Sequence, residues 1–444
     1  LGGASGGAGC VGGRWGWPFA GRRSAELAPL IPVAGSAVTC ACVTVGEFVA
    51  GVIGWYLMLE YAVAAATVSI AWGEYANRVL DWFGLRIPYQ WSHSPFEHDL
   101  AGIHGITNIP AVFILLVLTL LLIRGTKESA FVNGIIVVLK VSIVLLFICI
   151  GWGFINPANN MPLIPAATSY TTPQGIHHAY GGILGILGAA GVVFFAYIGF
   201  DAVSTAAQEA RNPKRDMPIG ILGSLCICTV LYVLFAYVLS GVATVHDFRT
   251  AGREASVAFA ITKYMTGYEW LSKSVTVAIL AGFSSVILVM LLGQSRVFFS
   301  MSRDGLVPKI FSHVHPRFRT PYKSNLLFFV FTGLFAAFVP ADVSGEMTSI
   351  GTLFAFILVC AGVWILRSRR PDLERGFRVP ALPVVATLGI IVCGAMIYGL
   401  GWTNWMRLIV WLLIGLIFYF GYGKSHSHIN APPPEMPEGI KLSR

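Results

Sequence analysis

The chain has 444 residues, of which 56% are hydrophobic and only 11% are charged. A soluble globular protein carries about 25% charged residues, so this composition excludes an ordinary soluble domain and indicates an integral membrane protein. The net charge is +9, but the basic residues gather in every second connection between apolar runs. That alternation is the pattern of membrane topology. We therefore expect the lipid bilayer as a partner and no nucleic acid.

Ten apolar segments are long enough to cross a membrane, which takes about 20 residues each. In chain order they cover residues 47–73, 105–124, 130–154, 181–207, 218–242, 271–300, 324–341, 348–367, 381–401 and 404–423. Basic connections lie at 124–127, 211–215, 303–323 and 367–378, and the connections between them are acidic, mixed or uncharged. The pattern predicts a multi-pass protein of the cell membrane (inner or plasma membrane) with both termini in the cytoplasm.

The cysteines and histidines do not form a recognisable metal or catalytic motif. Five of the eight cysteines lie inside apolar runs, where they act as small hydrophobic side chains: Cys149, Cys226, Cys228, Cys360 and Cys393. Cys40 and Cys42 have no partners at metal-ligand spacing, and His104, His177 and His178 fall in predicted loops. The HExxH and P-loop patterns are absent from the sequence. We expect no enzyme activity, no metal and no cofactor.

The most informative segment covers residues 192–221 and reads VVFFAYIGFDAVSTAAQEARNPKRDMPIGI. It begins as an apolar membrane run and then carries Asp201, two residues after Gly199. An ionisable side chain at membrane depth is energetically costly and usually faces a cavity or a partner. A glycine beside it lets the helix open, which a membrane permits only where the backbone lines a cavity or is buried in protein. This segment therefore predicts a transport site.

Several motifs in one order carry a family resemblance. They are PVAGSA (32–37), GWYLMLEYAVA (54–64), FFAYIGFDAVSTAAQEARNPKRDMPIGI (194–221), GQSRVFFSMSRDGLVPK (293–309), IGTLFAF (350–356) and FRVPALPVVATLG (377–389). Over residues 26–422 the chain resembles the amino acid–polyamine–organocation (APC) superfamily, specifically the cationic amino acid transporter (CAT) family and its bacterial relatives. The resemblance implies an all-α integral membrane fold, the LeuT-type inverted-repeat helix bundle, and secondary active amino acid transport by proton symport or as a permease.

The resemblance also implies a missing part. By motif, the span at 47–73 is similar to the family's third helix and 181–207 to its sixth, so about ten of twelve helices are represented. We expect residues 1–25, rich in glycine and arginine, to be an anomalous leader rather than native family sequence; an ordinary disordered leader is the alternative. Residues 26–423 form the bundle with an incomplete first repeat, and 424–444 a disordered tail. Two functions remain open: an amino acid transporter, or a truncated or frameshifted remnant without transport.

Substrate contacts are implied on the sixth-helix segment and on the eighth. Phe195, Ala196 and Ile198 match the family's substrate-lining positions, and carbonyls freed at the break from Ala196 to Gly199 would accept hydrogen bonds from the substrate ammonium. Met290 matches a position facing the side-chain pocket, where its bulk favours smaller or neutral amino acids over arginine. Ordinary packing of these side chains in a helix bundle is the alternative.

Lys140 stands in the middle of the apolar run GIIVVLKVSIVLLF. Such a lysine either extends its side chain to the interface or faces a cavity, and the long flanks favour a cavity. It matches a lysine of proton-coupled relatives, and Ser284 and Ser285 match the facing hydroxyl positions of that cation site. The resemblance thus implies that Lys140 couples transport to protons.

Three further charged residues are expected to be buried: Asp201, Glu60 and Arg296. We expect Asp201 mainly to brace the opened helix, with attraction of a cation as the alternative. Glu60 and Arg296 would be costly alone, so we expect them to pair with each other or with polar backbone groups.

Overall fold

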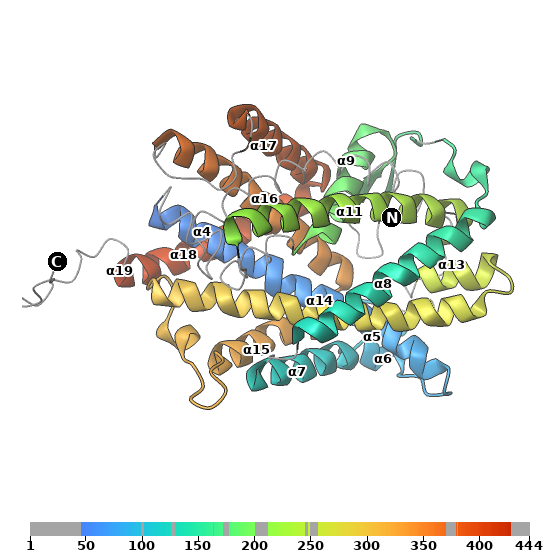
Figure 1. Cartoon of the computed structure of the whole chain (residues 1–444), viewed down its shortest axis with the longest axis horizontal. Coiled ribbons are helices and arrows are strands. Elements are labelled where there is room, and N and C mark those ends of the chain that lie inside the picture. Colours follow the sequence, from blue (N-terminus) through green and yellow to red (C-terminus); the bar gives the residue numbers. More distant parts are fainter. Residues whose placement is uncertain are drawn as a thin grey trace, which may run out of the picture.

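The computed structural model describes residues 46–98, 102–125, 129–162, 164–171, 177–199, 212–244, 247–248, 256–369, 379 and 381–427. The structure is helical almost throughout this part of the chain (Figure 1). The main apolar helices are α4 (Glu47–Met58) with η1 (Leu59–Val63) and α5 (Ala64–Asp81), α7 (Ile109–Arg124), α8 (Ser129–Gly151), α9 (Gly182–Val193) with η4 (Phe194–Tyr197), α11 (Pro213–Val242), α14 (Glu269–Arg303), α15 (Tyr322–Phe338), α16 (Ala341–Arg369), α17 (Leu382–Gly399) and α18 (Trp402–Phe418).

Shorter elements join these helices. They are α6 (Tyr89–Ser92), η2 (Trp152–Phe154), η3 (Pro157–Asn160), β1 (Thr168–Thr171), β2 (His177–Tyr180), α13 (Ser256–Tyr264), η6 (Lys309–Ser312), η7 (Tyr419–Gly423) and α19 (Lys424–His426). Within the described residues, seven helices are long and apolar enough to cross a membrane, and three shorter apolar helices accompany them. Together they correspond to the ten spans predicted from hydropathy.

Two predicted loops are partly regular structure. The connection that contains Asp342 and Glu346 belongs to α16, which begins at Ala341 instead of near residue 348. The prediction failed because acidic residues lower hydropathy, although they also favour a helix N-terminus through its dipole. In the uncharged connection 156–180, β1 pairs with β2 in antiparallel register, and Thr168 faces Tyr180.

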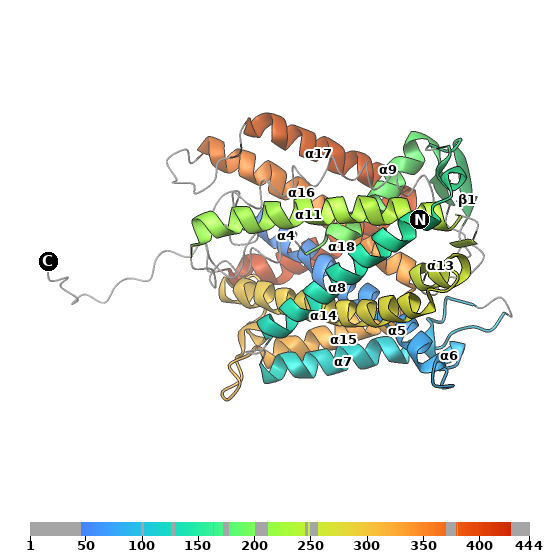
Figure 2. The same cartoon turned by 45° about the vertical axis from the view of Figure 1, so that its right-hand side comes forward.

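The helices lie side by side, with α7 and α15 along one edge of the molecule and α17 along the opposite edge (Figures 1 and 2). The long helix formed by α4, η1 and α5 lies between α14 and α16 and contributes to both large hydrophobic clusters. Most of its apolar residues are buried, whereas α8 and α11 expose most of theirs. Exposed apolar faces of this size on a membrane-length helix are the faces that meet lipid.

Local sequence explains the helix boundaries that frame the bundle. At the start of α7, Asn108 is the N-cap and its Oδ1 accepts a hydrogen bond from the Ala111 amide at 3.1 Å. Proline in the first turn of α7 needs no donor there, and Gly125 ends the helix with φ 98°. Such caps satisfy backbone groups that would otherwise be unpaired at the helix ends.

The two ends of the bundle differ in their balance of charge. One end holds α6, α13 and the hairpin of β1 and β2, and the other holds α19 (Figures 1 and 2). The acidic residues Asp81, Glu97, Asp247, Glu269 and Asp342 lie in or next to elements of the α13 end. Basic residues occur at both ends, with Arg78, Arg86, Lys263 and Lys273 at the α13 end. More of the described ones lie at the α19 end: Arg124, Arg303, Lys309, Arg317, Arg319, Lys323 and Lys424.

Candidate substrate and proton site

The candidate site is built around an interruption in the helix that contains α9. The α-helical part ends at Val193, and η4 narrows to 3-10 geometry through Tyr197. Ile198 is extended, with φ −63° and ψ 137°, and Gly199 has φ 104°. A positive φ of this size is accessible to glycine and strained for other residues, so the sequence places glycine where the helix opens.

Opening the helix frees backbone carbonyls for other partners. The Tyr232 hydroxyl on α11 donates a hydrogen bond to the carbonyl of Ala196 at 3.0 Å. Next to it, the Tyr197 hydroxyl donates to Thr229 Oγ1 at 3.4 Å, and the Tyr197 and Tyr232 rings meet edge to face. A carbonyl oxygen has two lone pairs, so the Ala196 carbonyl keeps acceptor capacity after Tyr232 is bound.

The residues predicted to line the substrate lie at this interruption. Ala196 is exposed, and Phe195 and Ile198 are half-buried and pack on the cluster that contains Tyr61 and Met290. Met290, on α14, is 4% exposed. Its Cε lies 2.9 Å from the position that a Cβ on Gly199 would occupy. The structure thus brings Met290 directly against the opened backbone.

Lys140 lies on α8 and is half-buried. Its aliphatic stem lies on Gly282 of α14, so closely that a Cβ at position 282 would collide with it. Ser285 is on the same face of α14, one turn further along, and is 8% exposed. Ser284 accepts a hydrogen bond from Trp72 Nε1 at 3.0 Å. Lys140 therefore contacts α14 on the face that carries Ser285, whereas Ser284 is bonded to Trp72 of α5.

Two of the predicted buried charges are described. Glu60 is fully buried and lies in η1, a single π-helical turn between α4 and α5. Such turns insert one extra residue into a helix and occur often at functional sites. Arg296 is half-buried on α14, the helix that α5 packs against. Asp201 lies outside the described residues.

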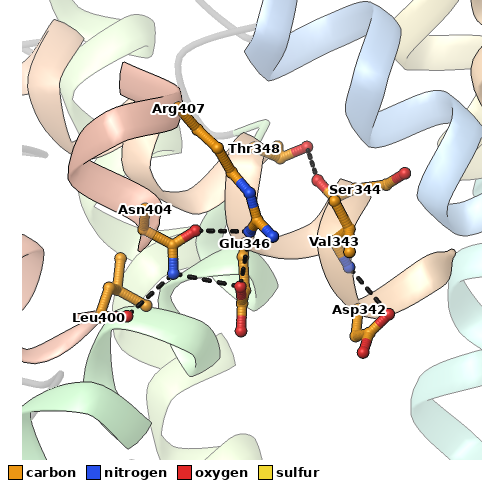
Figure 3. Close-up of polar contacts among 8 residues, drawn as sticks. All are labelled: Asp342, Val343, Ser344, Glu346, Thr348, Leu400, Asn404 and Arg407. Atoms are coloured by element: carbon orange, nitrogen blue, oxygen red, sulfur yellow. Dashed lines mark hydrogen bonds and ion pairs between the residues drawn. The ribbon is translucent and has the colours of Figure 1, made fainter. Parts of the chain in front are cut away.

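Sequence reasoning missed a buried polar cluster between α16 and α18 (Figure 3). Arg407 donates to Glu346 Oε2 at 2.9 Å and to Asn404 Oδ1 at 2.8 Å, and Asn404 Nδ2 donates to the same Glu346 oxygen at 3.1 Å. Tyr232 and Trp72 were missed as well. Tyrosine and tryptophan in apolar helices are common, and their sequence neighbours do not reveal which backbone or hydroxyl group they contact.

Within the described chain, no group of three or more His, Cys, Asp or Glu side chains gathers in metal-binding geometry. The membrane-length helices, together with the helix opened at residues 194–199, define the class of multi-pass membrane transport proteins. The family model for amino acid permease matches residues 15–422. The chain therefore belongs to the amino acid permease family, whose members are transporters with a LeuT-type fold, not enzymes.

Curated relatives agree with this family. The chain is 40% identical over 412 residues to the branched-chain amino acid permease BcaP of Bacillus subtilis (strain 168), covering 93% of this chain and 84% of the relative. It is 36% identical over 406 residues to the methylthioribose transporter of the same organism, covering 91% and 83%. It is 33% identical over 349 residues to cationic amino acid transporter 4, vacuolar, of Arabidopsis thaliana, covering 78% and 55%.

Proposed function

We propose that the chain transports a neutral aliphatic amino acid together with a proton. The proposal rests on three features placed along α14: the opened backbone at Ala196–Gly199, Met290 against Gly199, and the Lys140 stem against Gly282. The first two form one wall of an amino acid pocket, and the third supplies a titratable amine near the same helix.

The substrate ammonium would bind at the interruption. The Ala196 carbonyl has remaining acceptor capacity, and carbonyls at an interrupted helix carry the negative end of the helix dipole. Phe195 and Ile198 would cover the apolar part of the substrate. Met290 shortens this space, which supports a preference for a compact neutral side chain over arginine. The similarity to BcaP, a branched-chain amino acid permease, agrees with that preference.

Lys140 would carry the coupling proton. It is half-buried at the middle of the apolar helix α8, and Ser285 lies on the face of α14 that its stem contacts. Charged and neutral forms of such a lysine differ greatly in solvation. A proton that moves on and off the amine during the cycle would therefore change how tightly α8 and α14 associate.

The charge asymmetry of the bundle supports an orientation. The α19 end, which is basic, would face the cytoplasm, as the positive-inside rule requires. With an even number of crossings, both ends of the chain would lie on that side of the plasma or inner membrane. Glycosylation-site or protease-accessibility mapping at the exposed Arg86 and Arg317 would test this, because the two residues lie at opposite ends.

Uptake into proteoliposomes tests the function. We expect radiolabelled leucine or alanine to accumulate when the outside is acidic, and unlabelled leucine to compete better than arginine or methylthioribose. Better competition by methylthioribose would instead favour the substrate for which the methylthioribose transporter is named. The absence of uptake of any of these compounds would overturn the proposal and favour the truncated, non-transporting product.

A substitution isolates the proton step. Lys140→Met keeps the length and apolar character of the stem but removes the amine, so pH-driven accumulation should disappear while exchange of internal for external amino acid continues. Lys273→Met, an exposed lysine on α14, is the matched control and should leave both activities unchanged. Normal pH-driven uptake by Lys140→Met would refute the role of Lys140.

A further inference from the structure

Residues 305–323, which connect α14 to α15, form a surface that the transport function does not use. Four basic residues lie in this segment, Lys309, Arg317, Arg319 and Lys323, and the sequence has no acidic residue from 305 to 341. Lys309, Arg317 and Arg319 are exposed, and Lys323 is half-buried. The segment is therefore a concentrated positive charge at the α19 end of the bundle.

Apolar side chains alternate with these charges. Ile310, Val314 and Phe318 are 43%, 42% and 36% exposed. The Arg317 guanidinium lies 5.8 Å from the centre of the Phe318 ring. Exposed apolar groups among basic ones are typical of segments that lie in a membrane interface, where the apolar groups enter the head-group region and the charges meet lipid phosphates.

The segment is fixed at the edge where lipid meets the bundle. Thr320 Oγ1 donates a hydrogen bond to the Ile123 carbonyl at 2.7 Å, which ties the segment to the last turn of α7. α7 packs on α15, and both expose apolar faces to the outside, including Leu120, Leu121 and Leu326. Figure 1 shows the connection projecting from the ends of α7 and α15. Its charges therefore stand level with the head groups of the lipids that coat these two helices.

The backbone of the segment is also organised locally. The amides of Arg317 and Phe318 donate to His315 Nδ1 at 3.1 and 3.2 Å, and the His315 amide donates to the Thr320 carbonyl at 2.8 Å. These bonds hold Arg317 and Arg319 on a compact turn. Arginine presents planar donors that match phosphate oxygens, so an ordered turn with two exposed arginines suits a phosphodiester.

We propose that residues 305–323 form a binding surface for the head groups of anionic phospholipids, with Arg317 and Arg319 on the phosphate and Ile310, Val314 and Phe318 in the interface. The partner is the bilayer leaflet that surrounds α7 and α15. The surface is independent of the substrate site, so its test does not depend on transport.

Thermal unfolding of the purified full chain in a neutral detergent measures this binding, because a ligand that binds only the folded state raises the midpoint. We expect dioleoylphosphatidylglycerol to raise the midpoint more than dioleoylphosphatidylcholine, and high NaCl to remove the difference. Removing two basic charges from the surface should weaken the apparent Kd for phosphatidylglycerol by about 25-fold. The variant for this is Arg317→Gln/Arg319→Gln.

One control variant tests whether charge is sufficient for binding, and another tests whether the position of the charge matters. Arg317→Lys/Arg319→Lys keeps the charge and should keep most of the phosphatidylglycerol effect. Arg86→Gln/Lys273→Gln removes two exposed charges at the α13 end and should change nothing. Glycerol 3-phosphate distinguishes a membrane lipid from a free phosphate. The proposal would be overturned by any of three results. The two lipids could raise the midpoint equally, Arg317→Gln/Arg319→Gln could leave the Kd for phosphatidylglycerol unchanged, or glycerol 3-phosphate could raise the midpoint as much as phosphatidylglycerol does.

Discussion

Met290 of α14 lies against Gly199, the residue at which the interrupted helix leaves regular geometry. The Met290 Cε is 2.9 Å from the position of a Cβ at 199, and φ at Gly199 is 104°. A side chain at position 199 would therefore meet two obstacles. The end of a methionine can move, whereas the backbone angle cannot change without closing the interruption. Strain at such an angle costs about 1–3 kcal/mol.

We expect Gly199→Ala to lower both the thermal midpoint and the rate of leucine uptake. Adding Met290→Ala to this variant should restore only a small part of the lost thermal stability and uptake rate, since the backbone strain at position 199 remains. Gly394→Ala is the matched control: a Cβ there meets nothing within 4 Å, so the change should be neutral or slightly stabilising. Full recovery in Gly199→Ala/Met290→Ala would show that contact, not backbone angle, is the obstacle.

Met290→Ala alone should widen the pocket. We expect the ratio of arginine to leucine uptake to rise by at least about tenfold, because a pocket discriminates side-chain size by roughly that amount per methylene. Competition assays in proteoliposomes measure the ratio. Met301→Ala changes another buried methionine of α14, 3% exposed, and should lower stability without altering selectivity. An unchanged ratio in Met290→Ala would place Met290 outside the pocket.

Tyr232→Phe removes the hydroxyl that binds the Ala196 carbonyl. A lost hydrogen bond of this kind costs about 1 kcal/mol, and the interruption becomes less firmly held. We expect a higher KM for the amino acid with a smaller change in the maximal rate. Tyr237→Phe alters an exposed tyrosine of the same helix and serves as the control. Equal KM values for the two variants would contradict a positioning role for Tyr232.

The Glu346–Arg407 pair should stabilise the contact of α16 with α18 strongly. Arg407→Leu removes the counter-charge of a buried carboxylate that also accepts from Asn404, and such a loss costs about 3 kcal/mol. Glu346→Gln should be milder, since the amide oxygen can still accept from Arg407, whose charge stays bonded to Asn404 and is the more exposed of the pair. The double variant Glu346→Gln/Arg407→Leu should therefore be more stable than Arg407→Leu. Thermal midpoints in detergent rank the three variants. A double variant less stable than Arg407→Leu would refute the charge argument.

We expect the contacts of Asp247, at the α13 end, to weaken in acid. Hydrogen bonds from Lys263 first, and then from Thr244 and Tyr264, hold the pKa of this carboxyl below its usual range. A depressed folded-state pKa means that the contact stabilises above the ordinary carboxyl pKa of about 4 and loses that stabilisation as pH falls below it. Asp247→Asn should lower the midpoint at pH 7 but not at strongly acidic pH.

The exposed Asp81, at the same end, is the control for this change. Asp81→Asn should shift the midpoint little at either pH. An Asp247→Asn effect that is the same at neutral and acidic pH would mean that packing, not ionisation, explains the contribution of Asp247.

Hydropathy was sufficient to predict the ten spans because membrane crossing depends on length and apolar content alone. The interruption near Gly199 was predicted because glycine and a nearby aspartate are rare together at membrane depth. Helix ends were less predictable. The start of α16 at Ala341 depends on burial of Glu346 against Arg407, 61 residues away, which hydropathy does not record.

Side-chain contacts between different helices could not be predicted from the sequence either, because they join residues that are far apart along the chain. Trp72 and Ser284 are 212 residues apart, and their contact depends on the rotation of α5 against α14. The π-helical turn at Glu60 also lacks a sequence signal. Its segment reads as continuous helix, and the Leu59 side chain packs on Gly351 of α16 while the Tyr61 ring packs on Gly293 of α14. Those two tertiary contacts surround the extra residue.

The length of α14 has a mechanical consequence. Its 35 residues measure about 52 Å at 1.5 Å per residue, against about 30 Å for the hydrocarbon layer. The helix therefore extends beyond the hydrocarbon layer, so that its ends lie in water, whereas Met290 lies nearer its centre. A small tilt of α14 displaces its ends more than the pocket wall, so a spin label at each end, paired with a label on a neighbouring helix, would report the tilt without touching the substrate.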